Sequence, residues 1–411
     1  IRMKKILMIA FHFPPILGSS GMHRTLGFSR YLPEFGWEPI VLTAHPFAYE
    51  NQREELNKEI PAELQVERAF AFDAARHFSI FGRYPRALAV PDRWASWYFD
   101  AVRRGKQLLR QHQIDAIWSS YPIPTAHSIG LALHQFSGKP WISDFRDPMA
   151  QEGYPSDPIL KDAYIVLERA TIEQSTAVTL TTPGAVRLYH QRYPHFVDKV
   201  HLLENGYDEE TFVGTEAGAP LNPGKITLLH SGIVYPQERD PTSLFTALAT
   251  LKERNPELTN RLRLRFRAPA HEDLLVELSK RFGITELIEL MPPVGYREAL
   301  NEMLSADALM ILQSNGCNDQ IPVKLYEYLR AGRPIIALTD DAGDTAQLLK
   351  KVGIEAIAPL NDSMRIADML IRAISNFDKQ YLPSFEVIRD FSRKGRTYRL
   401  ARFLKDIVDP A

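Results

Sequence analysis

Three charged residues, Asp319, Lys324 and Glu327, lie close together in the sequence and could bind an anionic ligand. They fall in a polar loop and in the first turns of a predicted helix. Free backbone N–H groups at the start of a helix attract anions, and Lys324 adds a formal positive charge beside them. Gln320 and Ile321 would supply two of those N–H groups. A diphosphate fits this arrangement.

The carboxylates of this stretch suit the remaining parts of a nucleotide. Asp319 precedes the predicted helix and Glu327 lies about a turn and a half inside it, so both can line one pocket. Glu327 could accept hydrogen bonds from the two hydroxyl groups of a ribose. The simpler interpretation is that Lys324 and Glu327 form an ion pair on an exposed helix face, because residues three apart are neighbours there.

The surrounding sequence predicts the elements that would hold these residues. The apolar run from Ala306 to Leu312 predicts a buried parallel strand. Pro322 suits a first helical turn, and Gly332 and Pro334 end the helix just before a second strand, Pro334 to Leu338. The loop of such a unit lies at the carboxyl edge of a sheet, where open α/β folds bind ligands.

The N-terminus predicts a similar unit. A strand from Lys4 to Ala10 is followed by a loop of small residues from Gly18 to Gly21, a helix from Met22 to Phe35, and a strand from Pro39 to Thr43. Without bulky side chains in the loop, a phosphate or a sugar can approach its backbone. The loop lacks the G-x-G-x-x-G pattern and no acidic residue ends the second strand, which disfavours a dehydrogenase.

Asp144, Arg146 and Asp147 form a charged cluster at the end of another apolar strand. Buried charge is costly without partners, so a network among the three is the structural explanation. The functional explanation is a binding site. Arg146 is always charged, so it could hold a phosphate but could not act as a general base, whereas Asp144 or Asp147 could position a hydroxyl group. His127, on a preceding helix, could reach this place or be an ordinary buried histidine.

The segment from residue 74 to residue 113 is basic and aromatic. It contains eight Lys or Arg against two Asp, a local net charge of +6, with seven aromatic side chains interleaved. Such segments bind anionic membrane surfaces without spanning them, and we expect peripheral contact with anionic lipid here. A pair of core-packing helices with a solvated basic face explains the pattern equally well.

The composition limits the class of protein. The chain has 411 residues, which suits two domains, and 45% hydrophobic with 24% charged residues indicates a globular protein. The formal net charge of -1 gives no support for nucleic acid binding. The single cysteine, Cys317, and the lack of a signal peptide predict a cytoplasmic protein, and no apolar run is long enough to span a bilayer.

The second half of the chain repeats the alternation of strands and helices. A strand from Ile226 to His230 is followed by Gly232 and, after a polar turn, by Arg239 and a helix. A later turn contains Val294. Because both halves alternate strands with helices, the sequence predicts an α/β protein with two Rossmann-like domains that face each other across a cleft.

The stretch IPVKLYEYLRAGRPIIA, with Asp319 before it and Glu327 within it, resembles the donor site of retaining GT-B glycosyltransferases of family 4, in the branch that builds bacterial surface polysaccharides. The family has two acidic residues with seven positions between them, followed by a small residue, Gly, any residue and Pro. Here Asp319 replaces the usual Glu. The FPP-containing start and the Asn205-Gly206 turn also resemble the family. The resemblance covers nearly the whole chain.

The resemblance implies roles for individual residues. Family members carry Gly-Arg and then Lys six residues later to grip the diphosphate; this chain has Ile233 after Gly232, and Arg239 stands in place of the Lys. We infer that Lys324 supplies the missing positive charge. The other implied roles fall into three groups. Donor contacts are expected from Gly18, Ser19, Gly232, Arg239, Val294, Gln320, Ile321, Lys324 and Glu327, acceptor contacts from Ser20, Gly21 and His127, and catalytic contacts from Asp144, Arg146, Asp147 and Asp319.

The resemblance also implies a domain plan and a reaction. It implies an N-terminal acceptor domain over 1–207, a linker over 208–224, a nucleotide-sugar domain over 225–385, and a last helix within 386–411 that returns to the first domain. The expected reaction moves a hexosyl unit from a nucleotide diphosphate sugar, a UDP sugar above all, to a glycan or an undecaprenyl-linked acceptor at the inner face of the membrane. No cofactor or metal is expected. The alternatives are a nucleotide-sugar 2-epimerase and a non-catalytic scaffold subunit.

Overall fold

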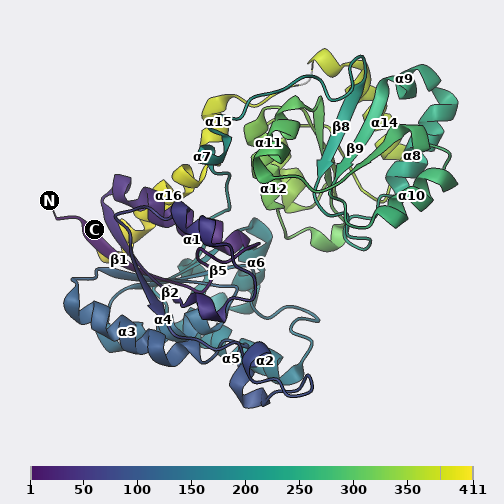
Figure 1. The fold of residues 1–411 in the computed structure, drawn as a ribbon. Helices are drawn as coiled ribbons and strands as arrows, with labels where there is room; N and C mark the ends of the chain where they lie inside the picture. The colour runs from purple at the N-terminus through teal and green to yellow at the C-terminus, as the bar shows by residue number, and fades with distance from the viewer. Residues whose placement is uncertain (1, 380, 410–411) are drawn as a thin grey trace. The chain divides into compact units, whose positions relative to one another are not determined.

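The structure, a computed structural model, describes residues 2–379 and 381–409, which form two α/β units (Figure 1). The first unit runs to Asn205 and resumes at Arg393, and the second unit comprises Gly206–Ser392. The first boundary thus falls after residue 205 rather than 207. Residues 208–224, predicted as a linker, and residues 386–392, predicted to return to the first domain, belong to the second unit.

Within the described residues the first unit is built on a 7-stranded parallel sheet with the strand order β3-β2-β1-β4-β5-β6-β7. Its strands are β1 (Lys4–Ala10), β2 (Trp37–Ala44), β3 (Gln65–Ala69), β4 (Ala116–Ser120), β5 (Trp141–Arg146), β6 (Ala177–Leu180) and β7 (Val200–Leu202). Its main helices are α1 (Ser20–Tyr31), α3 (Trp97–Gln111), α4 (Thr125–Ser137), α5 (Pro158–Gln174), α6 (Pro183–Arg192) and α16 (Arg393–Val408). Short helices include α2 (Ala74–His77) and η4 (Arg86–Ala89).

The second unit has a 6-stranded parallel sheet in the described residues, with the order β10-β9-β8-β11-β12-β13. Its strands are β8 (Ile226–Ser231), β9 (Leu262–Arg267), β10 (Ile288–Met291), β11 (Ala308–Leu312), β12 (Ile335–Leu338) and β13 (Ile357–Ala358). Its helices include α7 (Glu209–Phe212), α8 (Thr242–Arg254), α9 (Pro256–Arg261), α10 (Glu272–Arg281), α11 (Tyr296–Ser305), α12 (Val323–Ala331), α13 (Asp344–Lys351), α14 (Ser363–Ser375) and α15 (Phe385–Arg389).

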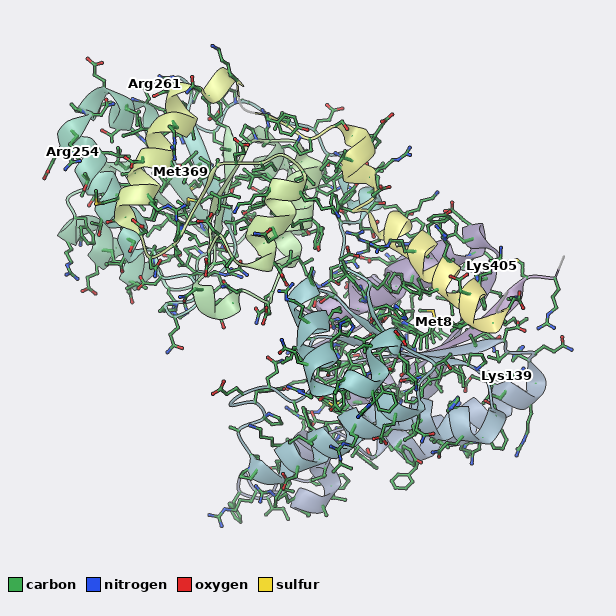
Figure 2. The ribbon with its side chains drawn as sticks, turned by 180° about the vertical axis from the view of Figure 1, so that it is seen from behind. Met8, Lys139, Arg254, Arg261, Met369 and Lys405 are labelled. Carbon is green, nitrogen blue, oxygen red and sulfur yellow. The ribbon has the colours of Figure 1, made fainter. Side chains whose placement is uncertain are left out.

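Both sheets are covered by helices on their two faces, which explains the uninterrupted apolar strands. In β1, Leu7 and Ile9 enter one core cluster and Ile6 and Met8 enter another, as expected of alternating side chains on a strand buried on both sides. Strand β11 divides its side chains in the same way. Figure 2 labels Met8 and Met369, each buried in the core of its own unit, and the exposed Arg254 and Arg261.

The last helix, α16, completes the core of the first unit. Its residues Leu400 and Leu404 are completely buried in one cluster with Leu26 of α1. Figure 1 shows this helix, in yellow, beside the purple N-terminal elements. The prediction that the C-terminal helix returns to the first domain is therefore confirmed. None of the described helices is both long and apolar enough to cross a membrane.

Candidate active site

The predicted loops lie where the order of strands reverses in each sheet. In the first unit, β1 has β2 on one side and β4 on the other; in the second unit, β8 lies between β9 and β11. A crevice opens beyond the carboxyl ends of the strands at such a point, and ligands bind there in open α/β folds. The loops after Ala10 and Ser231, and the loop between Leu312 and Val323, begin at these edges.

In the second unit, Arg239 and Lys324 belong to the two segments that meet at the end of β8, the loop that follows it and helix α12. Arg239 donates a hydrogen bond from Nη1 to the carbonyl of Ile233 at 2.6 Å, and its guanidinium lies 5.3 Å from the centre of the Tyr235 ring. Burial, above all, lowers the pKa of His230 in β8 to about 4, and the positive charges of Arg239 and Lys324 lower it further. Both cations therefore act on the same buried side chain.

Lys324 and Glu327 form the ion pair that one interpretation of the sequence predicts, with 2.8 Å between Nζ and Oε2. The pair is not simply solvated, because 13% of the Glu327 side chain is exposed against 34% of Lys324. The hydroxyl of Tyr296, at the start of α11, also donates to Glu327 at 2.8 Å. The sequence pointed to Val294 in this turn but not to Tyr296. The position of Tyr296 at the start of a helix that follows a strand end could have indicated its role.

The backbone at Gly232 is open to a ligand. Its φ of 132° is one that side-chain-bearing residues rarely adopt, and an added Cβ would meet no atom within 4 Å. The preceding amide, of Ser231, donates to the hydroxyl of Tyr328 in α12 at 3.0 Å. The strand end is thus fixed to the helix that carries Lys324, while the space beside Gly232 stays free.

Side chains hold the loop before α12 in place by donating hydrogen bonds to its backbone. The side chain of Gln313 donates to the carbonyl of Gln320 at 3.0 Å, and the hydroxyl of Thr345 donates to the same oxygen at 3.1 Å. Asp319 and Gln320 are exposed, and Ile321 is half-buried. Asp319 therefore lies on the accessible side of the edge. The amide of Gln320 donates to the carbonyl of Cys317 at 3.0 Å, so the prediction that this amide is free for a diphosphate is wrong.

In the first unit, Arg146 ends β5 in a left-handed conformation, with φ of 63°. Pairing with β6 shifts register here, and the amide of Asp147 donates back to the carbonyl of Phe145 at 2.7 Å. The amide and the hydroxyl of Thr181 both donate to the carbonyl of Arg146 at 2.9 Å. Residues in such conformations cost roughly 1–3 kcal/mol and are concentrated at functional sites.

The Arg146 guanidinium lies against the start of α1. Nη2 donates to the hydroxyl of Ser20 at 2.8 Å, and Nη1 donates to the carbonyl of Tyr121 at 3.4 Å. A Cβ on Gly21 would lie 2.7 Å from Nη1, so only glycine leaves room for this contact. Nε is buried with no partner among the described residues. The structure therefore brings Ser20, Gly21 and Arg146 together.

His12 joins this group, although the sequence analysis did not select it. Its Nδ1 lies 2.6 Å from the hydroxyl of Ser19, which also accepts from the amide of Met22 and caps α1. Burial and the nearby Arg146 charge lower the pKa of His12 to about 4. The imidazole is neutral at neutral pH and can take part in hydrogen bonds. Gly18 is exposed in the same loop, with a φ of 79°.

The prediction that Asp144 contacts the substrate is wrong, because Asp144 has a structural role. Its carboxylate accepts from Nε and Nη2 of Arg24 at 2.9 and 2.8 Å, and from the hydroxyls of Ser120 and Thr179 at 3.0 and 2.8 Å. Burial on its own would raise the pKa of Asp144, but the Arg24 guanidinium and these bonds lower it below its usual value. Completely buried and saturated, Asp144 cannot bind an acceptor hydroxyl; Asp147, in contrast, is exposed.

The prediction that His127 contacts the acceptor is also wrong. It is completely buried in α4, with Nδ1 2.8 Å from the hydroxyl of Ser119 and its ring 4.6 Å from that of Phe145. Burial lowers its pKa to about 3. His127 belongs to the core behind β5, which is the ordinary alternative that the sequence left open, and it cannot contact an acceptor.

Glu168 of α5 holds the loop that follows Arg146. Its carboxylate is buried and accepts from the amides of Met149 and Ala150 at 3.1 and 3.0 Å, and from the hydroxyls of Tyr189 and Tyr193 at 2.6 and 2.7 Å. Nothing in the sequence of helix α5 indicated that Glu168 would be buried or that it would hold this loop. Among the described residues, no group of three or more His, Cys, Asp or Glu could hold a metal ion.

Comparisons with known proteins agree with this fold. Residues 21–206 match the family described as glycosyl transferase 4-like domain. A search of the curated proteins finds no match. Sucrose-phosphate synthase from Thermosynechococcus elongatus is similar in structure, with 14% identity, 99% of this chain and 100% of that chain covered, and a TM-score of 0.64.

Two further solved structures show the same fold. Anabaena HepE in complex with UDP and glucose has 13% identity, with 98% of this chain and 100% of that chain covered, and a TM-score of 0.64. The lipopolysaccharide outer core galactosyltransferase WaaB has 13% identity, with coverage of 98% and 99%, and a TM-score of 0.62. The chain therefore has the GT-B fold, carries a glycosyl transferase 4-like domain over residues 21–206, and is a glycosyltransferase, as the sequence predicted.

Proposed function

We propose that this glycosyltransferase moves a hexosyl unit, with retention, from a UDP sugar to a lipid-linked or polysaccharide acceptor in the synthesis of a bacterial surface glycan. One observation carries the donor part of the proposal: Arg239, Lys324 and the open backbone at Gly232 converge at one strand end. HepE, similar in fold, was solved with UDP and glucose, and WaaB is a lipopolysaccharide galactosyltransferase.

The second unit would bind the diphosphate and the ribose. The departing diphosphate gains negative charge as the glycosidic bond breaks, and fixed cations and amides at that point stabilise it. Arg239 and Lys324 are such groups. Lys324 would exchange part of its contact with Glu327 for the phosphate, which would free Glu327, oriented by Tyr296, for the ribose hydroxyls.

The transfer step balances without an enzyme nucleophile. The bond between the sugar C1 and the phosphate oxygen breaks, and its electron pair goes to that oxygen. The acceptor oxygen forms its bond to C1 on the same face, and its proton passes to the departing phosphate. Arg146 cannot accept this proton, since a guanidinium stays charged. We assign Arg146 and the exposed Asp147 to holding the acceptor, and Asp319 to the donor sugar.

A thermal-shift screen with nucleotide diphosphate sugars tests the proposal, because a ligand that binds the folded state raises the melting temperature. UDP sugars should raise it more than GDP or ADP sugars do, and Lys324→Ala should remove the shift. Lys351→Ala, on the surface of α13, is the matched control. If no nucleotide sugar shifts the wild type, the donor proposal fails. If the donor alone is converted to its epimer, or if activity needs a second protein, the transfer proposal fails.

A further inference from the structure

An apolar cavity of about 570 Å³ lies in the first unit, in the segment between β3 and α3 and against α4. Its size is that of a small-molecule site rather than of a packing defect. Its walls are almost entirely hydrophobic and include Phe72, Phe78, Leu88, Val90, Pro91 and Phe99. Neither the diphosphate nor the sugar of the proposed reaction has chemistry that would fill such a space.

A second cavity, of about 800 Å³, adjoins the first, and its lining includes three arginines together with Asp92 and Asp157. We call it the arginine-lined cavity. Pro91 lines both. Arg83, Arg86 and Arg93 face the second cavity, together with Trp94 and Tyr164. An apolar space beside a cationic one matches a molecule that has a hydrocarbon part and an anionic part.

Two of these three arginines have carboxylate partners. Arg86 pairs with Asp157, and Arg93 pairs with Asp73 and Glu50, whereas no carboxylate of the described residues pairs with Arg83. Asp92 also lines this cavity, but its carboxylate is turned inward, where it accepts from the amide and the hydroxyl of Thr125 at 2.9 and 2.6 Å. Positive charge therefore remains available to an anion.

Three side chains that line the apolar cavity, Phe78, Leu88 and Phe99, are also exposed on the surface. Ile80 and Phe81, in the same segment of the chain but outside the cavity lining, are 72% and 101% exposed. Large apolar side chains gathered on a surface mark an interaction site. In the sequence these residues belong to the basic and aromatic segment, for which membrane contact and helix packing were equally good explanations.

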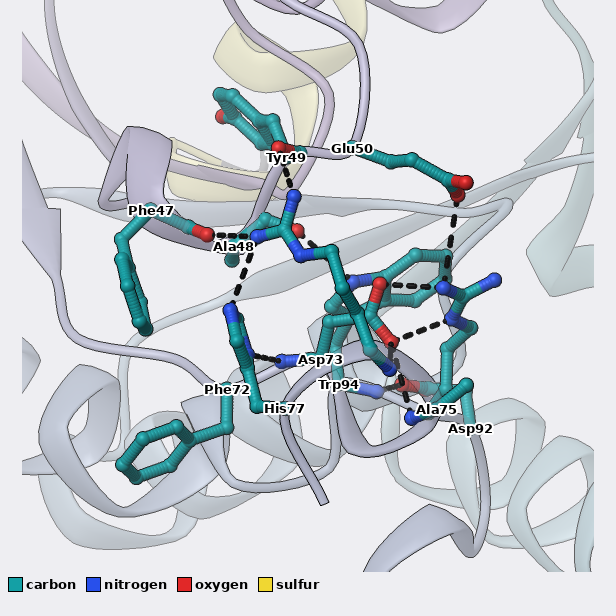
Figure 3. A network of polar contacts seen from close by, with 12 residues as sticks. Phe47, Ala48, Tyr49, Glu50, Phe72, Asp73, Ala75, His77, Asp92 and Trp94 are labelled. Atoms are coloured by element: carbon teal, nitrogen blue, oxygen red, sulfur yellow. Dashed lines mark hydrogen bonds and ion pairs between the residues drawn. The ribbon is translucent and has the colours of Figure 1, made fainter. Parts of the chain in front are cut away.

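A polar network holds the walls in place, and Figure 3 shows it from close by. The buried carboxylate of Asp73 accepts from Nε of Arg93 at 2.6 Å and from the amide of Ala75 at 3.1 Å. Arg76 donates to the carbonyl of Tyr49 at 2.7 Å, and the ring of His77 stacks on Phe47 with 4.3 Å between centres. These hydrogen bonds and this ring stack therefore fix the segments that carry the cavity walls.

A row of tyrosines leads from the arginine-lined cavity to Arg146. The ring of Tyr164, in the cavity wall, lies 6.2 Å from that of Tyr154. Burial raises the pKa of Tyr121, and Tyr164, Tyr154 and Asp147 raise it further, which places them around one phenol. The carbonyl of Tyr121 accepts from Arg146.

We infer that these adjoining cavities bind a lipid phosphate, with its hydrocarbon chain in the apolar cavity and its phosphate or diphosphate at Arg83 and Arg86. A sugar attached to that phosphate would extend along Tyr164 and Tyr121 to Arg146. This inference rests on the proposed function, since it makes the acceptor a lipid-linked sugar and gives it a site.

The test measures binding of three probes to the full-length protein by tryptophan fluorescence, since Trp94 lines the arginine-lined cavity. Farnesyl phosphate should bind at least about tenfold more tightly than farnesol or inorganic phosphate, because both parts of the site contribute. Equal binding of farnesyl phosphate and farnesol, or of farnesyl phosphate and phosphate, would overturn the inference.

Variants distinguish the site from a simple membrane contact. Ala87→Trp, at an exposed position in the wall of the apolar cavity, and Arg83→Ala should each weaken farnesyl phosphate binding about tenfold or more. Ser128→Trp is a second variant that fills the apolar cavity. Phe81→Ser is the control, because Phe81 is exposed and lines neither cavity. Binding of each variant is measured with farnesyl phosphate and with phosphatidylglycerol vesicles. If Phe81→Ser is the one variant that reduces binding, the segment docks on a bilayer and the inference is wrong.

The UDP-sugar thermal shift separates this inference from the proposed function. All four variants should keep that shift, since none lies in the second unit. If the donor shift is present and farnesyl phosphate does not bind, the lipid site fails while the donor proposal stands. If the donor shift is absent in the wild type, the proposed function fails whatever the lipid result.

Discussion

Both units place charged residues near the carboxyl ends of strands, but the surroundings of these residues differ. In the first unit Asp144 and Arg24 are completely or almost completely buried and bound to each other, with Arg146 above them. In the second unit Arg239, Lys324 and Glu327 keep part of their surface in solvent, and Lys324 is paired within its own helix. The first arrangement is part of the core, whereas the second can be rearranged by a ligand.

This difference in burial predicts which charges contribute to stability and which contribute to ligand binding. A buried ion pair that loses one partner leaves an uncompensated charge, which costs about 3–5 kcal/mol, whereas an exposed pair contributes about 0–1 kcal/mol. Loss of a charge from the buried Asp144–Arg24 pair should therefore affect folding, whereas loss of a charge from the partly exposed group in the second unit should affect ligand affinity. Each prediction below tests one part of this contrast.

The largest effect is expected from Asp144→Ala. Arg24 would be left buried without its bidentate partner, so the free energy of unfolding should fall by about 3–5 kcal/mol in urea titrations. Arg239→Ala, the corresponding change in the second unit, should lower it by less than about 1 kcal/mol. Equal losses from both variants would contradict the contrast.

Arg146→Gly should reduce activity while it spares the fold. Glycine accepts the left-handed φ of 63° without strain, so the backbone turn is kept and only the guanidinium is removed. We expect kcat/KM to fall by about 100-fold or more, the usual effect of removing a positioned charge, with little change in the urea midpoint. Ala268→Gly, at a second left-handed residue with φ of 52°, is the control and should retain activity.

Gly232→Ala should weaken donor binding without unfolding the second unit. The added methyl group meets no protein atom, so it occupies only the space beside the strand end, although the φ of 132° adds some strain. We expect a donor Kd about 10-fold higher, measured by calorimetry with a UDP sugar. Gly283→Ala, at another positive-φ glycine of the second unit where an added Cβ also meets no atom within 4 Å, controls for the strain. Equal losses of affinity in both variants would exclude a ligand at Gly232.

Buried histidines should produce the smallest effect, a dependence of stability on pH. The pKa of His127 is about 3 in the folded state, so between pH 6.5 and that value the unfolded chain binds a proton that the folded chain does not. Stability should therefore fall as the pH is lowered from 6.5, by at most about 1.4 kcal/mol per pH unit for this residue. His127→Gln should flatten the curve relative to the exposed His195→Gln, and parallel curves would contradict this account.

The sequence predicted the fold and the strand ends well because both depend on local patterns. Apolar runs marked β1, β8 and β11, and the glycines at 21 and 232 marked places where the backbone must stay open. Neither the pairing of Arg24 with Asp144 nor the burial of His127 could be predicted. The first joins residues 120 positions apart and depends on β1, β4 and β5 being neighbours in the sheet. The second depends on which face of α4 meets β5, and the short apolar repeat of that helix does not determine this.

The return of α16 to the first unit has a consequence for synthesis of the chain on the ribosome. Residues 206–392 form one continuous unit and can fold as soon as they emerge, but the first unit lacks Leu400 and Leu404 until α16 has been made. The unit that is translated first is therefore completed only after the second unit, and a stop codon just before Leu400 would damage the first unit while leaving the second unit able to fold.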